Sequence, residues 1–189
     1  MSCEEIKKCV KDKIFIDLGG GFCTVQYAGI QSRMSIAINI LRSHLKNHNC
    51  QDLELENIFM IQGDAQNLPL RSNSVDVVLM AHTLEHVSDY EAAMGEIKRI
   101  LKQCGDLILV LPNETSINGY NYLNPKEIFR ILLKKKRNFN DIKPFAIGGN
   151  DGPTYHGHLH IFDNIVLAKY LERTGFDIIN TKQGFSFVE

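Results

Sequence analysis

The stretch KIFIDLGGGF, residues 13–22, carries the strongest structural signal in this chain. Its first half, IFIDL at 14–18, is an apolar run typical of a parallel strand that is buried on both faces. Asp17 and three glycines mark the carboxyl end of that strand. A Cβ at Gly19 or Gly21 would stand in the way of a ligand that approaches the backbone closely. We therefore predict that a nucleoside-sized ligand binds beside this turn, although a tight turn alone would also use glycine.

The bulk composition describes an ordinary globular protein. The chain has 189 residues, 44% hydrophobic and 23% charged, which suits one domain with its own core. A formal net charge of −1 gives no electrostatic reason to expect nucleic acid or an anionic membrane as the partner. The five cysteines are scattered and never spaced as CxxC, so neither disulfides nor a zinc cluster is predicted. Without a bilayer-length apolar run or a signal-peptide stretch, we expect a cytoplasmic protein that acts on a small molecule.

Apolar runs and helical periodicities alternate along the sequence. The predicted strands are 14–18, 25–30, 58–62, 75–80, 106–112 and 176–181. The predicted helices are 32–46, 89–102 and 162–174, the last two closed by Gly105 and Gly175. This alternation predicts an α/β fold: a Rossmann-like, doubly wound, mostly parallel sheet with helices on both faces.

Polar or small residues follow several of the predicted strands. Asp17, Gln31, Asp64 and Ala81 all fall at carboxyl ends. Because the carboxyl ends of parallel strands meet at one edge of a sheet, these residues predict a single ligand cleft.

Residues 113–160 interrupt the alternation with Asn, Gly and Pro and one predicted short helix at 125–136. The segment is too long for a plain connection, so we expect one domain, 1–189, in which 113–160 form a cap or lid. The alternating His156, His158 and His160 would share one face of a strand, but no Cys or carboxylate cluster completes a metal site. No metal is predicted.

Four segments together resemble a known family. They are IDLGGG (16–21), IQGDAQNLPLRSNSVDVVLMAHTLEHV (61–87), EIKRILKQCGDLILVLPN (96–113) and GHLHIFDNIVLAKYLERTGFDII (157–179). They resemble the class I S-adenosylmethionine-dependent methyltransferases, specifically the small-molecule group called type 11. The resemblance implies methyl transfer from S-adenosylmethionine to a small molecule, leaving S-adenosylhomocysteine.

The resemblance also implies roles for residues at the adenosine end of the ligand. Asp64 would accept a hydrogen bond from the adenine amino group, and the amides of Ala65 and Gln66 would meet the ring nitrogens. Met80 and Ala81 would complete the cofactor site at the end of the strand 75–80. Gln31 would hold the ribose hydroxyls.

At the methionine end, the resemblance implies that Gly19 and Gly21 let the backbone close over the ligand, while Asp17 orients the cationic sulfonium. His86 is a candidate general base, since an imidazole titrates near neutral pH. His82 is no stronger a candidate than His86, and Leu84–His86 could instead simply open a helix.

The sequence departs from the family pattern at several points. Cys23 stands where a third glycine is usual, and neutral Gln31 replaces an acidic residue. Residues 18–24 are too few for an ordinary crossover helix, so we expect that helix to be shortened or absent. Alternatively, 22–46 form one long helix and the second strand is lost. We also expect the last strand to be truncated to a stub near Glu189, and an exposed sheet edge could pair in a homodimer.

These departures leave two rival functions open. A non-catalytic methyltransferase-like binding or regulatory module would keep the sheet but have weakened cofactor affinity. A nicotinamide-dependent oxidoreductase would need glycine where Thr24 stands, which makes it the weaker rival.

Overall fold

The computed structural model describes residues 3–20, 31–40, 57–112, 159–160 and 162–181. The chain divides into two compact units, residues 1–111 and 112–189, which are described separately here.

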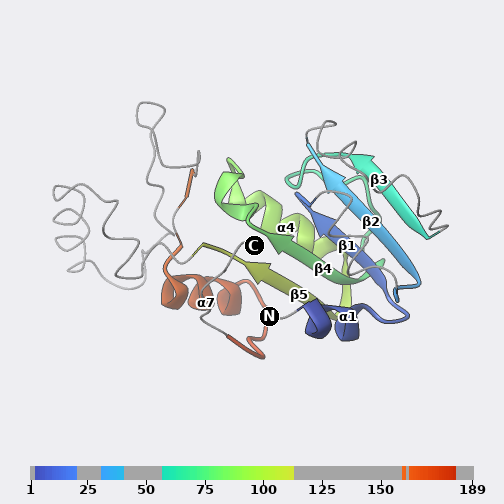
Figure 1. The fold of residues 1–189 in the computed structure, drawn as a ribbon. Coiled ribbons are helices and arrows are strands. Elements are labelled where there is room, and N and C mark those ends of the chain that lie inside the picture. The colour runs from blue at the N-terminus through green and yellow to red at the C-terminus, as the bar shows by residue number, and fades with distance from the viewer. Residues whose placement is uncertain (1–2, 21–30, 41–56, 113–158, 161, 182–189) are drawn as a thin grey trace, which may run out of the picture. The chain divides into compact units, whose positions relative to one another are not determined.

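The first unit is built on a parallel sheet with strand order β3-β2-β1-β4-β5 (Figure 1). Its strands are β1 (Ile14–Leu18), β2 (Met34–Asn39), β3 (Ile58–Gln62), β4 (Val75–Ala81) and β5 (Leu101–Val110). Its helices are α1 (Cys3–Val10), the short 3-10 helix η1 (Leu84–His86) and α4 (Tyr90–Ile100). The predicted Rossmann-like α/β fold with a parallel sheet is confirmed.

The centre of the sheet is buried because β1 and β4 carry apolar side chains on both faces. On one face, Phe15, Val77 and Leu79 pack with Val10 of α1, and all four are at most 1% exposed. Burying a side chain of this size stabilises the fold by about 1.5–3 kcal/mol. Helix α1 was not predicted from the sequence, although its Ile6 and Val10 have helical spacing and pack against this cluster.

Helix α4 connects the sheet to the loop between β3 and β4. The Asp89 carboxylate caps its start by accepting a hydrogen bond from the Ala92 amide. At its other end, the carbonyls of Arg99 and Ile100 accept hydrogen bonds from the backbone just before β4. Its buried residues are Tyr90, Ala93, Met94, Ile97 and Ile100.

Gly105 does not close α4 as predicted. The helix ends at Ile100, the next residue is already extended, and Gly105 lies inside β5. The pairing of β4 with β5 is irregular between Val75 and Val77, and a Cβ on Gly105 would lie 3.0 Å from the Lys102 carbonyl oxygen. Glycine at this position therefore serves close packing at an irregular part of the strand.

The predicted position of the second strand is wrong. Residues 34–39, which were expected to lie in a helix, form β2 and pair in parallel with β1 and β3. Residues 19–33 therefore separate β1 from β2, which is enough chain for an ordinary crossover. The argument for a shortened or absent first helix, and the alternative of one long helix over 22–46, both fail with this correction. Residues 21–30 lie outside the described part of the chain.

The amino-end edge of the sheet is held by paired charges. Lys13 Nζ lies 2.9 Å from Asp106 Oδ2, and Lys102 Nζ lies 2.7 Å from Asp76 Oδ1. Asp76 also accepts a 2.9 Å hydrogen bond from the Ile14 amide. Burial raises the pKa of Asp76, but Lys102 and the Ile14 amide lower it by more, so the net pKa lies below its ordinary value. Asp76, which lies in one of the segments that resemble the family (61–87), therefore has a structural role.

The described part of the second unit contains α7 (Asn164–Arg173). The Asp163 carboxylate caps its start, and Gly175, with φ +87°, follows its end as predicted. The Phe176 amide donates to the Leu171 carbonyl and completes the C-terminal turn. The predicted strand at 176–181 is wrong, because those residues form neither strand nor helix.

Candidate functional site

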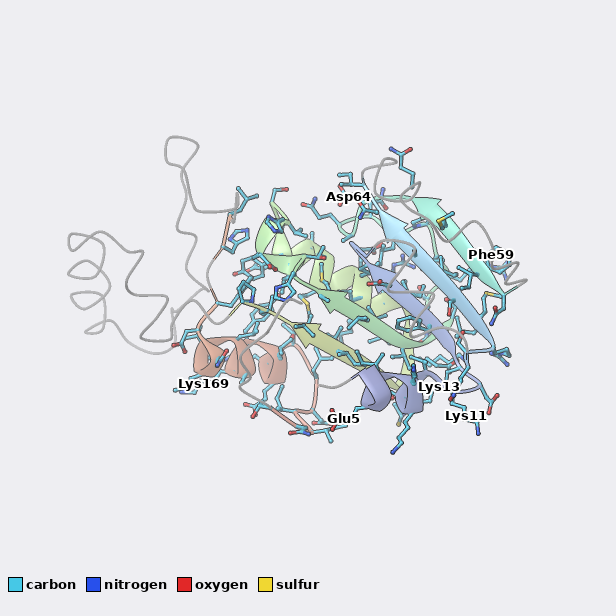
Figure 2. The ribbon with its side chains drawn as sticks, viewed as in Figure 1. Glu5, Lys11, Lys13, Phe59, Asp64 and Lys169 are labelled. Atoms are coloured by element: carbon cyan, nitrogen blue, oxygen red, sulfur yellow. The ribbon has the colours of Figure 1, made fainter. Side chains whose placement is uncertain are left out.

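The candidate site lies at the carboxyl edge of the sheet, where β1, β2, β3 and β4 all end. Figure 2 shows Asp64 at this edge and Lys13 at the opposite one. The predicted residues Asp17, Asp64 and Ala81 are placed here by the parallel strand order.

The glycine turn after β1 is closely packed from two sides. Gly19 has φ +80°, and a Cβ there would overlap the Thr83 side chain. A Cβ on Gly20 would overlap the carboxylate of Asp17, which is fully buried. Side chains are therefore excluded at two successive positions, which leaves bare backbone next to a buried carboxylate. Gly21, predicted to contact the cofactor, lies outside the described residues.

Asn39, at the end of β2, holds the carbonyl side of this turn. Its Nδ2 donates a 2.8 Å hydrogen bond to the Gly19 carbonyl and a longer one, 3.4 Å, to that of Gly20. Its own carbonyl accepts from the Gly63 amide over 3.1 Å. Through these bonds Asn39 connects the ends of β1, β2 and β3. Its side chain is buried, with 5% exposed.

The sequence prediction missed Asn39 and assigned its place to Gln31. Gln31 precedes β2, and its carbonyl accepts a 2.9 Å hydrogen bond from the Asp12 amide before β1. It therefore lies at the amino-end edge of the sheet, away from the other predicted site residues. The neutral polar residue at the end of the second strand is Asn39.

The loop after β3 orders the Asp64 carboxylate through Gln66. Asp64 Oδ1 accepts from the Gln66 amide over 2.9 Å, and both carboxylate oxygens lie within 3.2 Å of Gln66 Nε2. The Gln66 amide, predicted to meet an adenine nitrogen, thus donates to Asp64 in this structure. Ala65 lies between them in the turn and is partly buried.

Gln66 also connects this loop to the start of α4. Its Oε1 accepts hydrogen bonds of 3.0 Å from Ser88 Oγ and from the Asp89 amide. Because its amide group donates to Asp64 at the same time, Gln66 fixes the carboxylate relative to the segment that leads into α4.

A charged pair on α4 braces the same loop farther along. Glu96 accepts from Arg99 Nε over 2.7 Å and from the Leu68 amide over 2.7 Å, while Arg99 donates to the carbonyls of Leu68 and Leu70. The hydrogen bond from Arg99 lowers the pKa of Glu96, the Leu68 amide adds to that effect, and burial opposes it. The loop that carries Asp64 is therefore attached to a helix at two places.

The end of β4 supplies the remaining predicted residues. Met80 is fully buried and Ala81 partly buried. Thr83 Oγ1 donates to the Ala81 carbonyl over 2.9 Å, which keeps the threonine side chain against Gly19. His86, the predicted base, is exposed at the end of η1.

The described residues contain no group of three or more His, Cys, Asp or Glu side chains placed to hold a metal ion. Of the HxHxH residues, His160 is described; it is 8% exposed, and its ring centroid lies 6.0 Å from that of Phe162. His156 and His158 lie outside the described residues. Within the described part, no helix has the length and apolar character needed to span a membrane.

Comparison with known proteins identifies the family to which this chain belongs. Residues 17–109 match the model of a family described as a methyltransferase domain. The match confirms the resemblance to the class I S-adenosylmethionine-dependent methyltransferases. The matched segment runs from Asp17 at the end of β1 to Leu109 in β5, so it contains the strand ends and loops of the candidate site.

Individual relatives agree with the family match. An uncharacterized protein of Methanocaldococcus jannaschii is 32% identical over 139 residues, which is 74% of this chain and 55% of that protein. A demethylmenaquinone methyltransferase of Staphylococcus epidermidis is 38% identical over 80 residues, 42% of this chain and 31% of that enzyme. The chain thus spans about half or less of these relatives' lengths.

The fold has counterparts among solved structures. A SAM-dependent methyltransferase of Thermotoga maritima superimposes with a TM-score of 0.60 at 20% identity. The superposition covers 93% of this chain and 70% of that one. At this identity the likeness establishes the methyltransferase fold.

Proposed function

We propose that this chain binds S-adenosylmethionine at the carboxyl edge of its sheet and transfers the methyl group to a small molecule. The observation that carries the proposal is the turn at Gly19 and Gly20. It is held between Asn39 and Thr83 above the buried Asp17 carboxylate. Bare backbone beside a buried negative charge suits a ligand that is cationic at its sulfonium end.

At the adenosine end, the residues present fit the ligand. Asp64 is the acceptor for the adenine amino group, and its carboxylate is oriented in advance by Gln66. Because the carboxylate is oriented before the ligand arrives, the entropic cost of binding is smaller. Ala65, Met80 and Ala81 line the same edge in this proposal.

Asn39 replaces Gln31 as the proposed ribose residue. Its Nδ2 donates to the glycine turn, and its amide oxygen Oδ1 is an acceptor of the kind that a ribose hydroxyl can bind. A neutral amide makes weaker hydrogen bonds than a carboxylate. The proposal therefore includes modest cofactor affinity.

When bound, S-adenosylmethionine supplies an activated methyl group for in-line transfer. This chain's own residues contribute mainly by positioning, which suits a site with few titratable groups. The base named from the resemblance, His86, is one of two histidines that follow β4, the other being His82. Residues 113–160 remain the proposed cap over the acceptor. No acceptor is carried over from the menaquinone enzymes, because their match covers 42% of this chain.

The rival proposal, a non-catalytic relative with poor cofactor affinity, rested on three features. Two of them, Gln31 at the end of a strand and the short crossover, are contradicted by the position of β2. The third, Cys23, lies outside the described residues. What supports that alternative is now the neutral residue at the end of the second strand, which is Asn39 in place of Gln31.

The test is transfer of radiolabel from methyl-labelled S-adenosylmethionine into a total small-metabolite extract. We expect label in the extract with the wild type and a loss of about tenfold or more in Asp64→Ala, which removes about 1.4 kcal/mol or more of binding. Asp177→Ala, an exposed aspartate in the second unit, is the control. Equal transfer by Asp64→Ala and the control would refute the assigned site.

A further inference from the structure

Glu85 is a buried carboxylate for which the proposed function has no use. It is the middle residue of η1 and is 1% exposed. Among the described residues, neither Oε1 nor Oε2 has a hydrogen-bond partner. Burying such a group is costly unless a partner compensates it, so its position requires an explanation.

The side chain of His82, three residues earlier, is the potential ion-pair partner of Glu85. His82 Nδ1 lies 3.7 Å from Glu85 Oε1, within ion-pair reach but beyond a hydrogen bond. Catalytic hydrogen bonds are often long before the ligand binds and tighten in the complex. The Glu85 carboxylate on one side of the His82 imidazole is thus buried, while the His82 side chain itself is 50% exposed.

The backbone at His82 is also unusual. It has φ +48°, a left-handed conformation that is uncommon outside glycine and is found preferentially at functional sites. Its amide donates a 2.9 Å hydrogen bond to the Val110 carbonyl, which fixes this conformation directly after β4. His82 therefore follows β4 directly at the carboxyl edge of the sheet and precedes Thr83, whose side chain packs against Gly19.

We infer that Glu85 positions His82 as the proton acceptor of the methyl-transfer reaction. When the ligand binds and the 3.7 Å distance closes, Glu85 accepts a hydrogen bond from Nδ1–H of His82, which leaves Nε2 unprotonated. This inference rests on the proposed function and deepens it, because it names the acceptor class: a hydroxyl or an N–H group that must lose a proton.

The chemistry balances without a further reactant. The acceptor's oxygen or nitrogen forms a bond to the methyl carbon as the sulfur–methyl bond breaks, and the electron pair of that bond stays on sulfur. The proton of the acceptor passes to His82 Nε2, and the imidazolium is stabilised by the Glu85 carboxylate. The proton then leaves to solvent from the half-exposed ring.

The direct test is nitrogen NMR of the histidine rings in the full chain saturated with S-adenosylhomocysteine. Free neutral imidazole favours the proton on Nε2, so a proton on Nδ1 of His82 is diagnostic of an acceptor beside that atom. We expect the Nδ1–H form in the wild type, its loss in Glu85→Ala, and partial retention in Glu85→Gln, which keeps an oxygen. A wild-type His82 in the Nε2–H form, or a tautomer unchanged in a folded Glu85 variant, would overturn the pair.

Label transfer from methyl-labelled S-adenosylmethionine into the metabolite extract tests the proton-acceptor role. We expect His82→Gln to lose about a hundredfold in rate, the lower end for a general base, with S-adenosylhomocysteine affinity unchanged. A smaller loss in His82→Gln than in His86→Gln would overturn the assignment. If the wild type binds S-adenosylhomocysteine but transfers no label, the proposed function fails as well. If label transfer is lost in the His82 and Glu85 variants and retained by the wild type, the proposed function is supported together with this inference.

Discussion

Asn39 Nδ2 donates a 2.8 Å hydrogen bond to the carbonyl oxygen of Gly19. This contact joins the end of β2 to the turn after β1, and the Gly19 amide in turn donates to the Ile38 carbonyl over 2.7 Å. The turn is thus bonded to β2 through both its amide and its carbonyl. One of these two bonds comes from a side chain, which is the basis of the first prediction.

Asn39→Ala removes the side-chain bond to Gly19 and should reduce S-adenosylhomocysteine affinity about tenfold, as calorimetry would measure. It should also lower the free energy of unfolding by about 1 kcal/mol, the usual net value of a hydrogen bond. Asn57→Ala is a matched control, because Asn57 Nδ2 donates to the Ser32 carbonyl over 2.9 Å away from the site. The control should lose similar stability and keep its affinity, and equal affinity in both variants would contradict this role of Asn39.

Alanine substitutions at three glycines should have effects of opposite sign. Gly19→Ala combines a left-handed φ with overlap on Thr83, and Gly20→Ala overlaps the Asp17 carboxylate. Both should be destabilised by about 1 kcal/mol or more. Gly95→Ala, in α4 with open space around its Cα, should instead be stabilised by about 0.5–1 kcal/mol. Chemical denaturation measures all three, and a Gly19→Ala protein as stable as the wild type would contradict the close packing of the turn.

Gln66→Ala should weaken ligand binding without unfolding the protein. The side chain orients Asp64 and contacts Ser88 and the Asp89 amide. We expect S-adenosylhomocysteine affinity to fall about threefold to tenfold, corresponding to roughly 0.7–1.4 kcal/mol. Gln103→Ala, an exposed glutamine in β5, is the control. An unchanged dissociation constant in Gln66→Ala would show that Asp64 needs no such support.

The free energy of unfolding should fall at acidic pH because the folded state favours ionised Glu96. Its pKa is lowered on folding, first by the Arg99 hydrogen bond, from an ordinary value of 4.5. The resulting stabilisation is fully present above the unfolded pKa and is lost as the pH falls through the lower folded pKa. Glu96→Gln should cost about 1–2 kcal/mol at pH 7. The difference from the wild type should shrink below about pH 4.

Glu91→Gln serves as the control for this pH series, since Glu91 is exposed on the same helix. Its unfolding free energy should differ from the wild type by about 0.5 kcal/mol or less. A gap between Glu96→Gln and the wild type that stays constant from pH 7 to pH 3 would contradict the assigned cause.

The sheet could largely be predicted from sequence because buried parallel strands are continuous apolar runs. β1, β3 and β4 were placed correctly from such runs. β2 was missed because Ile36 and Ile40 have helical spacing, and a short apolar run does not by itself distinguish strand from helix. The length of a parallel crossover was the stronger constraint and favoured a strand at 34–39.

The candidate site was predictable where a residue type is required by the backbone. Gly19 and Asp64 follow strands whose ends were correctly placed, so their location was correctly predicted. Asn39 was missed together with its strand. The Glu85 and His82 pair depends on a three-residue helix and a left-handed residue, and neither leaves a periodic signal in the sequence.

The central claim, that this edge of the sheet binds S-adenosylmethionine, is tested most directly by isothermal titration with S-adenosylhomocysteine. The account predicts saturable binding on the order of micromolar, about 8 kcal/mol. It also predicts loss of that binding in Asp64→Ala, and no binding of NAD to the wild type. Absence of heat at millimolar S-adenosylhomocysteine, from a protein shown to be folded, would contradict the account.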